Sequence, residues 1–325
     1  LYADISKFHE ETIKYHDVTS LYPSVYAHHT LPMGQPIFYL GSDVDMDRLH
    51  PDHPMAYFGY VRCHIRPQSA DHIGVLPFRS EEGRLTFPVC PMKGTWFTKE
   101  IHIALGLGYQ LLEVYEVIHW EPSERSDQHL KGYVGYFLRM KQEAEGWKKL
   151  GASSDHPSEE EKAHVSEALF HQNGQLGRIR HDRVEPNPIK RQLAKLYLNA
   201  LWGKFAQRPS AQGHIYLYGD RQFFQFWHDH RINHEHTSFR IMYPGVYQAY
   251  YQYKPQFCQP VGHANVFIAA AVTAGARTVL HQRLLKIQSH HLTDRLGVSY
   301  PRILYCDTDS VIFIWPKQGE ELTSV

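Results

Sequence analysis

The tightest constraint on the fold of this chain is a turn with two carboxylates that joins two strand-like runs, residues 303–305 and 311–314. Asp and Ser are common turn residues, so an ordinary β-hairpin would account for the polar residues between the runs. It would not account for Asp307 and Asp309 at i and i+2, because an extended backbone points both side chains to one face. Two such carboxylates repel each other unless one takes a proton or a cation lies between them. A divalent metal is the simpler solution, and a calcium loop is disfavoured because its glycine and final glutamate are absent.

A third carboxylate, Asp17, stands in the stretch YHDVTSLYPSVY, residues 15–26. An apolar approach leads to this acid, and a run of small, aromatic and proline residues follows it. A lone aspartate after a strand is most often a turn residue or a helix cap. The pair of acids near the other end of the chain supplies a second interpretation, in which Asp17 belongs to the same metal site.

Basic residues crowd the segment from 171 to 208, where they exceed the acidic residues by six. They are Arg178, Arg180, Arg183, Lys190, Arg191, Lys195, Lys204 and Arg208. A segment this basic favours an anionic partner, although a solvated helix face remains the alternative.

A helix is predicted inside that basic segment, over residues 189–202, because prolines precede it and Gly203 can end it. Arg191, Lys195 and Asn199 fall at i, i+4 and i+8 and so form one stripe on one face. The opposite face is expected to be buried through Leu193, Leu196, Ala200 and Leu201. Two cations and an amide in a row favour a chain of phosphates as ligand over a solvated surface.

The remaining elements can be placed only coarsely. A strand, a turn and a short helix are expected within residues 1–40, and hairpins within 41–120. Helices are expected at 131–149 and 159–169, with Ser158 and Glu161 as a capping box and a flexible tip at 149–158. Aromatic and histidine-rich strands are expected around 214–230, followed by a helix of small residues near 265–285. The aromatic residues between 216 and 257 are expected mainly to form a core, and the alternative is that they stack on single-stranded bases.

Composition limits the class of protein. With 325 residues, 42% of them hydrophobic, the chain can form several cores, and 34 basic against 34 acidic residues argue against a protein that coats nucleic acid over its whole surface. No apolar run of about 18 residues and no secretion signal occur, so we expect no membrane span. The four cysteines form no CxxC pair, which favours reduced thiols and an intracellular protein of unspecified compartment. The scattered histidines are a weak basis for a zinc site. Because the chain starts without methionine and stops just after a strand-like run, we expect it to be a fragment that is truncated at both ends.

Three motifs resemble those of family B DNA polymerases, and they occur in the order found there. DVTSLYPS is similar to motif A, D-x-x-S-L-Y-P-S, and KLYLNALWG is similar to motif B, K-x-x-x-N-S-x-Y-G. YCDTDS matches motif C, Y-x-D-T-D-S, at every position. LPMGQP, GTWFTKEI and GYQLLEVYEV resemble the protein-primed branch, which includes polymerases of bacteriophages, adenoviruses and Maverick/Polinton transposons. Motif B departs from the family at Ala200 and Trp202, which predicts altered packing near the nascent base pair without loss of chemistry.

The resemblance implies a mixed α+β fold, with a palm made of an antiparallel sheet and helices, helical fingers and β-hairpin insertions. It implies two palm segments, 1–40 and 263–325, and fingers at 131–205. Residues 41–130 and 206–262 occupy the positions of the first and second terminal-protein regions.

The resemblance also implies a role for each motif residue. Asp17, Asp307 and Asp309 would be the catalytic acids, with Asp17, Asp309 and the Val18 carbonyl holding two Mg²⁺ ions, which Mn²⁺ could replace, and with Asp307 as the weaker ligand. Peptide N–H groups of residues 18–21 would bind phosphate oxygens, and Tyr22 would exclude a ribose 2′-hydroxyl. The residues implied for nucleotide binding are Ser20, Leu21, Tyr22, Arg191, Lys195 and Asn199, and those implied for DNA binding are Gly203, Lys204 and Arg277.

The function that follows is template-directed DNA polymerisation from a primer or a protein-bound 3′-hydroxyl. The expected partners are template and primer DNA, deoxynucleoside triphosphates and a terminal protein, and no membrane. A fragment of this kind could be inactive alone, and an inactive remnant of a mobile element that binds nucleic acid or a partner is the alternative. A reverse transcriptase is disfavoured because Thr308 separates the two acids of motif C.

Overall fold

The computed structural model describes residues 11–18, 20–68, 73–207, 212–258, 262, 264–289, 292–293 and 299–316. It divides into two compact units, which are described separately below. The larger unit comprises Leu1–Trp202 with Phe267–Val325, and the smaller comprises Gly203–Val266. No helix in these ranges is both long and apolar enough to span a membrane.

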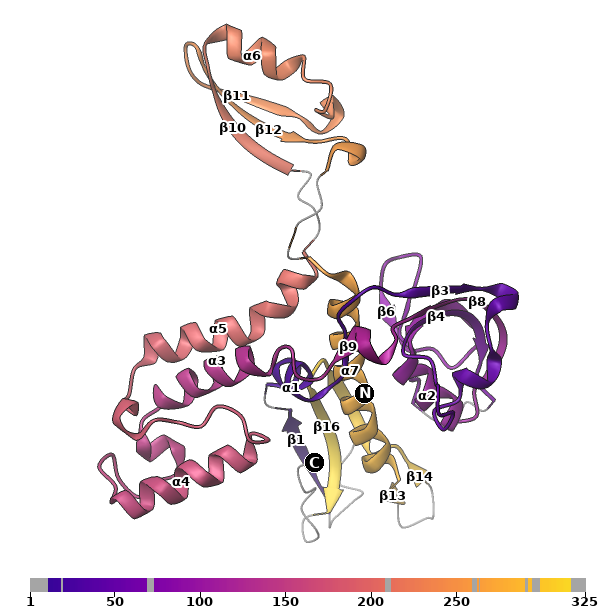
Figure 1. Ribbon diagram of the computed structural model, residues 1–325, viewed down its shortest axis with the longest axis vertical. Helices are drawn as coiled ribbons and strands as arrows, with labels where there is room; N and C mark the ends of the chain where they lie inside the picture. Colours follow the sequence, from indigo (N-terminus) through magenta and orange to yellow (C-terminus); the bar gives the residue numbers. More distant parts are fainter. Residues whose placement is uncertain are drawn as a thin grey trace. The chain divides into compact units, whose positions relative to one another are not determined.

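A three-stranded antiparallel sheet joins the two ends of the chain in the larger unit (Figure 1). Its strands are β1 (Glu11–Asp17), β15 (Ile303–Asp307) and β16 (Ser310–Pro316), in the order β1-β16-β15. Alternate residues of β16, Val311, Phe313 and Trp315, are buried against Leu280, Leu284 and Ile287 of α7 (Val266–Gln288). The predicted strands on both sides of the motif C turn are therefore confirmed, and α7 confirms the predicted helix of small residues.

Helix α1 (Leu21–His28) packs closely on α7 at Gly275. A Cβ atom at this position would lie 2.8 Å from Cγ1 of Val25 and 2.9 Å from Nδ1 of His29. The strand, turn and short helix predicted for residues 1–40 are observed as β1 and α1. Glycine at 275 thus lets the helix that follows Asp17 approach the helix that supports the sheet.

We expect Gly275→Ala to lower the free energy of unfolding by about 1–3 kcal/mol, because the added methyl group overlaps two side chains in a packed contact. Urea denaturation measures the change. Gly132→Ala is the control, since nothing lies within 4 Å of a Cβ atom at that helical position. Equal stability of the Gly275→Ala protein and the wild type would show that α1 and α7 are not in close contact.

A second antiparallel sheet is inserted between α1 and the helices that follow. It contains β3 (Ile37–Leu40), β4 (Gly59–Arg66), β7 (Met92–Phe97) and β8 (Gln110–His119), in the order β3-β8-β4-β7. Helix α2 (Thr98–Gly106) covers it, with Ile101 and Ala104 buried in its core. The hairpins predicted for this region are confirmed, but the prediction missed α2, whose nine residues follow β7 directly. Two-residue strands complete the unit: β2 (Leu31–Pro32) with β9 (Arg125–Ser126), β5 (Phe78–Arg79) with β6 (Leu85–Thr86), and β13 (Leu292–Thr293) with β14 (Ser299–Tyr300).

Three helices form a separate group in the larger unit: α3 (Lys131–Glu143), α4 (Glu159–Gln172) and α5 (Pro188–Phe205) (Figure 1). The predicted helices are confirmed, and the Ser158 hydroxyl accepts a hydrogen bond from the Glu161 N–H at 3.2 Å. The capping box is only half formed, because the Glu161 carboxylate accepts from the N–H and the hydroxyl of Ser153.

Two predictions about α5 are wrong. Gly203 does not end the helix, which continues to Phe205. The residues expected to be buried are not: Leu193 and Leu196 are 46% and 59% exposed, Ala200 is exposed and Leu201 is half-buried. Ala194 and Leu198 are buried instead, because α5 meets α3 along that row, where Tyr197 stacks on Phe137.

The smaller unit is a sheet of β10 (Gln212–Tyr218), β12 (Val246–Gln252) and β11 (Ser238–Tyr243) with one helix, α6 (Gly219–Trp227). The strands expected around 214–230 are confirmed only as far as Tyr218, since the next nine residues are helical. Phe223, Phe226 and Trp227 share one face of α6 and contact Phe239 of β11. Their spacing of i, i+3 and i+4 is helical, and it is hidden in the sequence because Phe224 adds a fourth aromatic residue that does not follow this spacing.

Candidate active site

Asp17 and Asp309 are held together by the β1–β16 ladder. Asp17 pairs with Ser310, and the N–H of Val18 donates to the carbonyl oxygen of Asp309 at 2.7 Å. Burial raises the pKa of Asp309, and the Asp17 carboxylate, with a smaller effect of Asp307, raises it further. The prediction that the Val18 N–H faces a phosphate is therefore wrong, because this group already has a partner.

The turn of motif C differs from the extended chain assumed for it. Thr308 has φ 48°, and the turn consists of Thr308 and Asp309 alone. Asp307 ends β15, is exposed, and accepts a hydrogen bond from the Thr308 hydroxyl at 2.9 Å. Strand alternation therefore does not relate Asp307 to Asp309, and only Asp309 lines the adjoining cavity.

Backbone strain gathers at the turns that follow Asp17 and precede Ser310. Ser20, immediately before α1, has φ 56° and ψ 42°. Among non-glycine residues in the described ranges, Ser20, Thr308 and Gln175 are the ones with positive φ. Left-handed backbone is costly for residues with a Cβ atom and persists where the surroundings impose it.

A cavity of about 500 Å³ collects side chains from four separate segments of the sequence. Its walls come from the β1–α1 turn, from α3 and α5, and from the motif C turn. The residues that line the cavity are Asp17, Ser20, Leu21, Tyr22, Pro23, Lys141, Arg191, Lys195, Leu198, Asn199, Thr308 and Asp309. All the residues that the sequence assigns to nucleotide binding thus line one cavity together with two of the three predicted acids.

Tyr22 lies against Trp202, one of the two departures in motif B. The ring centroids are 5.6 Å apart, and the Trp202 indole N–H donates to the carbonyl oxygen of Ala269 on α7 at 3.1 Å. Burial raises the pKa of Tyr22, so its phenol stays protonated at neutral pH. Trp202 is therefore fixed to α7 and supports one side of the Tyr22 ring.

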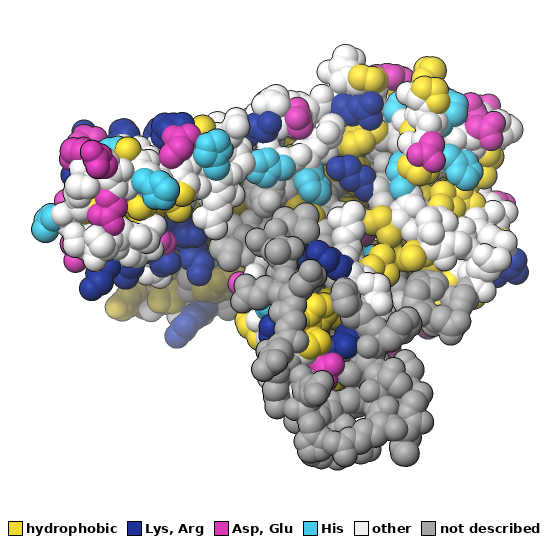
Figure 2. All heavy atoms as spheres, turned by 90° about the horizontal axis from the view of Figure 1, so that it is seen from below, with side chains coloured by type: hydrophobic (Ala, Val, Ile, Leu, Met, Phe, Trp, Pro, Cys, Tyr) yellow, Lys and Arg dark blue, Asp and Glu magenta, His cyan; other side chains and the backbone are white. Residues whose placement is uncertain are grey.

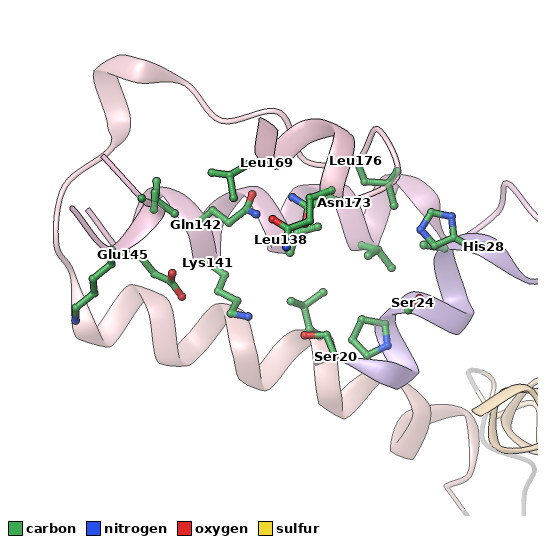
Figure 3. Close-up of a pocket in the computed structure, with 18 residues that line it drawn as sticks. Ser20, Ser24, His28, Leu138, Lys141, Gln142, Glu145, Leu169, Asn173 and Leu176 are labelled. Atoms are coloured by element: carbon green, nitrogen blue, oxygen red, sulfur yellow. The ribbon is translucent and has the colours of Figure 1, made fainter. Parts of the chain in front are cut away.

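Lys141 is a cavity residue that the sequence analysis missed. It projects from α3 toward α5 (Figure 3). Burial lowers its pKa, Glu145 opposes this, and the charges of Arg191 and Lys195 lower the pKa further. The sequence gives only a weak indication that Lys141 belongs to the site, because the packing of α3 on α5 alone brings this lysine to the cavity that the motif B residues line.

Most of the basic segment is paired within the protein. Of its seven described cations, five lie within 4.0 Å of a carboxylate, and Arg208 lies outside the described residues. Figure 2 shows the result, with Lys, Arg, Asp and Glu side chains interspersed on the helical group at the left. Arg191 is bound to Glu145 at 2.9 Å, whereas Lys195 forms no ion pair with any described residue. Lys195 is thus the cation of the predicted stripe that is available to an anion.

Glu143 is the buried carboxylate that organises this paired region. It is 1% exposed, and Arg180 donates to it from its backbone N–H, Nε and Nη2 at 3.0–3.1 Å. Lys190, near the start of α5, lies 4.0 Å away. Burial alone would raise the pKa of Glu143, but the hydrogen bonds and charge of Arg180, with Lys190, lower it. This carboxylate therefore fixes the loop that leads into α5.

We expect Glu143→Gln to lower the free energy of unfolding by about 2 kcal/mol at pH 7, because charged hydrogen bonds at a buried site are lost. Since the folded-state pKa is depressed, this stability is present above the unfolded pKa of about 4.3 and is lost as pH falls through the folded value. Urea denaturation of both proteins at pH 7 and below pH 4 should show the difference shrinking in acid. Glu159→Gln, which removes an exposed pair with Lys162, is the control and should change little.

The predicted DNA-binding residues are not gathered at the cavity. Arg277 of α7 binds the buried Glu100 carboxylate of α2, in the inserted region, at 2.7 Å. Lys204 donates to Gln207, and Gly203 and Lys204 belong to the smaller unit. A second cavity, of about 550 Å³, lies between α1, α3 and α4 (Figure 3) and shares with the first the lining residues Ser20, Pro23, Lys141 and Leu198.

The donor atoms near Asp309 suit a hard divalent cation. No cluster of three His, Cys, Asp or Glu side chains suited to a metal occurs among the described residues. Mg²⁺ in sites that act on phosphates is commonly bound by one or two carboxylates, with substrate oxygens and water as the other ligands. Asp17 raises the pKa of Asp309, and a cation shared by the two would relieve this repulsion. The residues present therefore fit a magnesium ion that is completed by a bound phosphate.

Comparison with known proteins gives one family match. Residues 2–152 match the family described as DNA polymerase type B, organellar and viral. No curated protein sequence matches the chain significantly.

Solved structures of Phi29 DNA polymerase have a similar fold. The ternary complex with primer-template DNA and incoming nucleotide substrates superposes with a TM-score of 0.54 at 18% identity, over 97% of this chain and 40% of that one. The post-translocation binary complex with primer-template DNA gives 0.49 at 18% identity, over 96% and 39%. At this identity the likeness concerns the fold, and the chain spans about two fifths of the Phi29 enzyme. The first 152 residues are thus similar to the type B DNA polymerases of the organellar and viral family, and the fold of nearly the whole chain is similar to that of Phi29 DNA polymerase.

Proposed function

We propose that this chain is the catalytic core of a template-directed DNA polymerase, which adds deoxynucleotides to a 3′-hydroxyl by phosphodiester formation. The observation that carries the proposal is the cavity in which acids of motifs A and C meet cations of α3 and α5. Carboxylates on one wall and free or exchangeable cations on the other suit a triphosphate that carries a divalent ion. Such a site performs its chemistry by positioning and by charge stabilisation.

Asp17, Asp309 and the Val18 carbonyl would hold the two Mg²⁺ ions, and Asp307 would be an accessory acid. Bound there, the ions would lower the pKa of the primer hydroxyl and neutralise the triphosphate. The β1–β16 ladder, with the hydrogen bond from the Val18 N–H to the Asp309 carbonyl oxygen, sets the backbone of Asp17 beside that of Asp309.

Lys195, Arg191 and Lys141 would bind the triphosphate from the opposite wall. Lys195 is available at once, whereas Arg191 would have to exchange Glu145 for a phosphate. Ser20 and Leu21 would donate to phosphate oxygens at the start of α1, and Asn199 would support the base. Tyr22, backed by Trp202, would exclude a 2′-hydroxyl by contact with the sugar.

The wider assignments follow the family. Residues 1–40 and 263–325 would be palm, and 131–205 fingers, while 41–130 and 206–262 would stand in the places of the two terminal-protein regions. Gly203, Lys204 and Arg277 would contact DNA, with Arg277 first releasing Glu100. The short motifs that resemble the protein-primed branch support initiation of DNA synthesis on a terminal protein. The gene would then belong to a virus or a mobile element, and the protein would act inside the host cell.

Single-nucleotide extension of a primed template tests the proposal. We expect residues 1–325 to add the templated deoxynucleotide with Mg²⁺ or Mn²⁺ and to stop when a chelator is added. If this chain is silent, the longest parent protein is assayed in the same way. Metal-dependent extension by either supports the proposal, and silence of both would favour an inactive remnant that only binds nucleic acid.

A further inference from the structure

The second cavity extends well beyond the proposed catalytic cavity. It lies between α1, α3 and α4 and has a volume of about 550 Å³ (Figure 3). Ala27 of α1, Gln142 of α3 and Leu169 of α4 line it and do not line the catalytic cavity. Sites for small molecules commonly have volumes of about 300–1,000 Å³. The second cavity is therefore large enough for a small-molecule ligand of its own.

Two side-chain amides of this cavity each have a buried atom without a hydrogen bond. They are Oε1 of Gln142 and Nδ2 of Asn173, and neither has a partner within the part of the chain that the structure describes. Gln142 is only 7% exposed. Figure 3 shows both amides in the cavity, one from α3 and one from the end of α4. Because an unpaired buried polar atom costs free energy, a ligand that offers a donor to Gln142 and an acceptor to Asn173 would be stabilised here.

The wall that carries Asn173 is built from unusual backbone. Gly174, Gln175 and Gly177 have φ values of 64°, 63° and 65°. A Cβ atom at Gly174 would lie 2.5 Å from Cε1 of His28 on α1, and one at Gly177 would lie 3.0 Å from a backbone oxygen of α3. Left-handed backbone is costly for Gln175, which has a Cβ atom, and persists where the surroundings impose it. Contacts with α1 and α3 thus hold the segment that presents the Asn173 amide.

Apolar and hydroxyl groups complete the lining. Leu138, Leu169 and Leu176 line the cavity near the two amides (Figure 3). Ser20 and Ser24 line it from α1. Leucine side chains suit the faces of a flat ring, and a serine hydroxyl can both donate to and accept from another hydroxyl. The lining therefore suits a ligand that joins a flat heterocycle with one polar edge to a part that carries hydroxyl groups.

The geometry points to a nucleoside as the ligand of this cavity, bound through the edge of its base. In thymidine, the N3–H would donate to Oε1 of Gln142, and a neighbouring carbonyl oxygen would accept from Nδ2 of Asn173. The ring would lie among the leucines, and the sugar hydroxyls would face Ser20 and Ser24. A purely apolar ligand accounts for the cavity less well, because it would leave both amide atoms unpaired.

Saturation-transfer NMR of thymidine with residues 1–325, without DNA or metal, tests the inference. We expect a Kd of about 0.2 mM, which is the affinity that the usual efficiency of drug-sized ligands gives for a molecule of this size. N3-methylthymidine lacks the base donor and should bind about tenfold more weakly. Gln142→Met and Asn173→Leu keep the approximate size of the side chain, remove the amide and should each weaken thymidine binding about tenfold.

Asn199→Leu is the matched control for position. Of the two cavities, Asn199 lines only the catalytic one, so loss of its amide should leave thymidine binding unchanged. Urea denaturation without ligand is the control for folding. Gln142→Met should be as stable as the wild type, because the Gln142 oxygen has no hydrogen bond to lose.

Four results would each overturn the inference. They are absence of thymidine binding, equal binding of N3-methylthymidine, loss of binding in Asn199→Leu instead of Gln142→Met and Asn173→Leu, and a marked loss of stability in Gln142→Met. The inference does not rest on the proposed catalysis, because neither Gln142 nor Asn173 lines the catalytic cavity. Single-nucleotide extension is measured on the same proteins without thymidine, and Gln142→Met should leave it unchanged. Failure of extension in all the proteins would count against the proposed catalysis alone.

Discussion

Asp309→Asn is expected to reduce single-nucleotide addition by at least about 10³-fold while primer-template binding persists. The substitution keeps the size of the side chain but removes the charge that, with Asp17, faces the cation wall of the cavity. Metal and charge stabilisation at such sites is worth several kcal/mol, and each 1.36 kcal/mol is a factor of ten in rate. Rapid-quench kinetics with a saturating deoxynucleotide, beside gel-shift measurement of DNA binding, separates the chemical step from association.

Two further variants make this result specific. Asp307→Asn should cost less than Asp309→Asn, because Asp307 is exposed, is bonded to Thr308 and does not line the cavity. Asp43→Asn, at an exposed carboxylate of the inserted region, should leave the rate unchanged. An Asp309→Asn protein with full activity would eliminate the proposed arrangement of metal ligands.

Tyr22→Ala is expected to raise ribonucleotide incorporation by about 10–100-fold relative to deoxynucleotides. The exclusion comes from overlap between the ring and a 2′-hydroxyl, and forced overlap in a packed site costs about 1–3 kcal/mol. Trp202 supports the ring at 5.6 Å and is itself held by the Ala269 carbonyl, so Tyr22 has little room to retreat. The measurement is the ratio of kcat/KM for a ribonucleotide and the matching deoxynucleotide opposite the same template base.

Tyr22→Phe is the matched control. It retains the ring and its contact with Trp202 while removing the hydroxyl, so discrimination should remain close to that of the wild type. If Phe and Ala at this position admitted ribonucleotides equally, the hydroxyl would be responsible, and exclusion by the ring would be refuted.

Local signals in the sequence were sufficient for much of the fold. The acid pair of motif C between two strand-like apolar runs predicted the hairpin, and the prolines before 189–202 located the start of α5 within one residue. Each of these predictions depends on properties of residues that are close in the chain: the preference of Asp and Ser for turns, the missing N–H groups of proline and the period of the side chains. The same holds for α1, which begins soon after Asp17.

Features that depend on distant partners could not be predicted. The buried row of α5 runs through Ala194 and Leu198 because α3 lies there, and hydrophobicity alone favoured the leucines at 193 and 196. Lys141 belongs to the candidate site only because of the same contact. The partner of Arg277 proved to be Glu100, 177 residues away, a pairing that no local pattern contains.

The hydrogen bond from Trp202 to Ala269 attaches α5 to α7 one turn before the end of α5, so the preceding residues of α5 would act as a lever about this point. At 1.5 Å per residue, Lys195 lies about 10 Å and Arg191 about 16 Å along the axis from the anchored residue. A rotation of only about 10° about this point would carry Lys195 nearly 2 Å and Arg191 nearly 3 Å, enough to make or break contact with a phosphate. Closure of α5 on the proposed nucleotide would therefore require no rearrangement of the sheet that carries the acids.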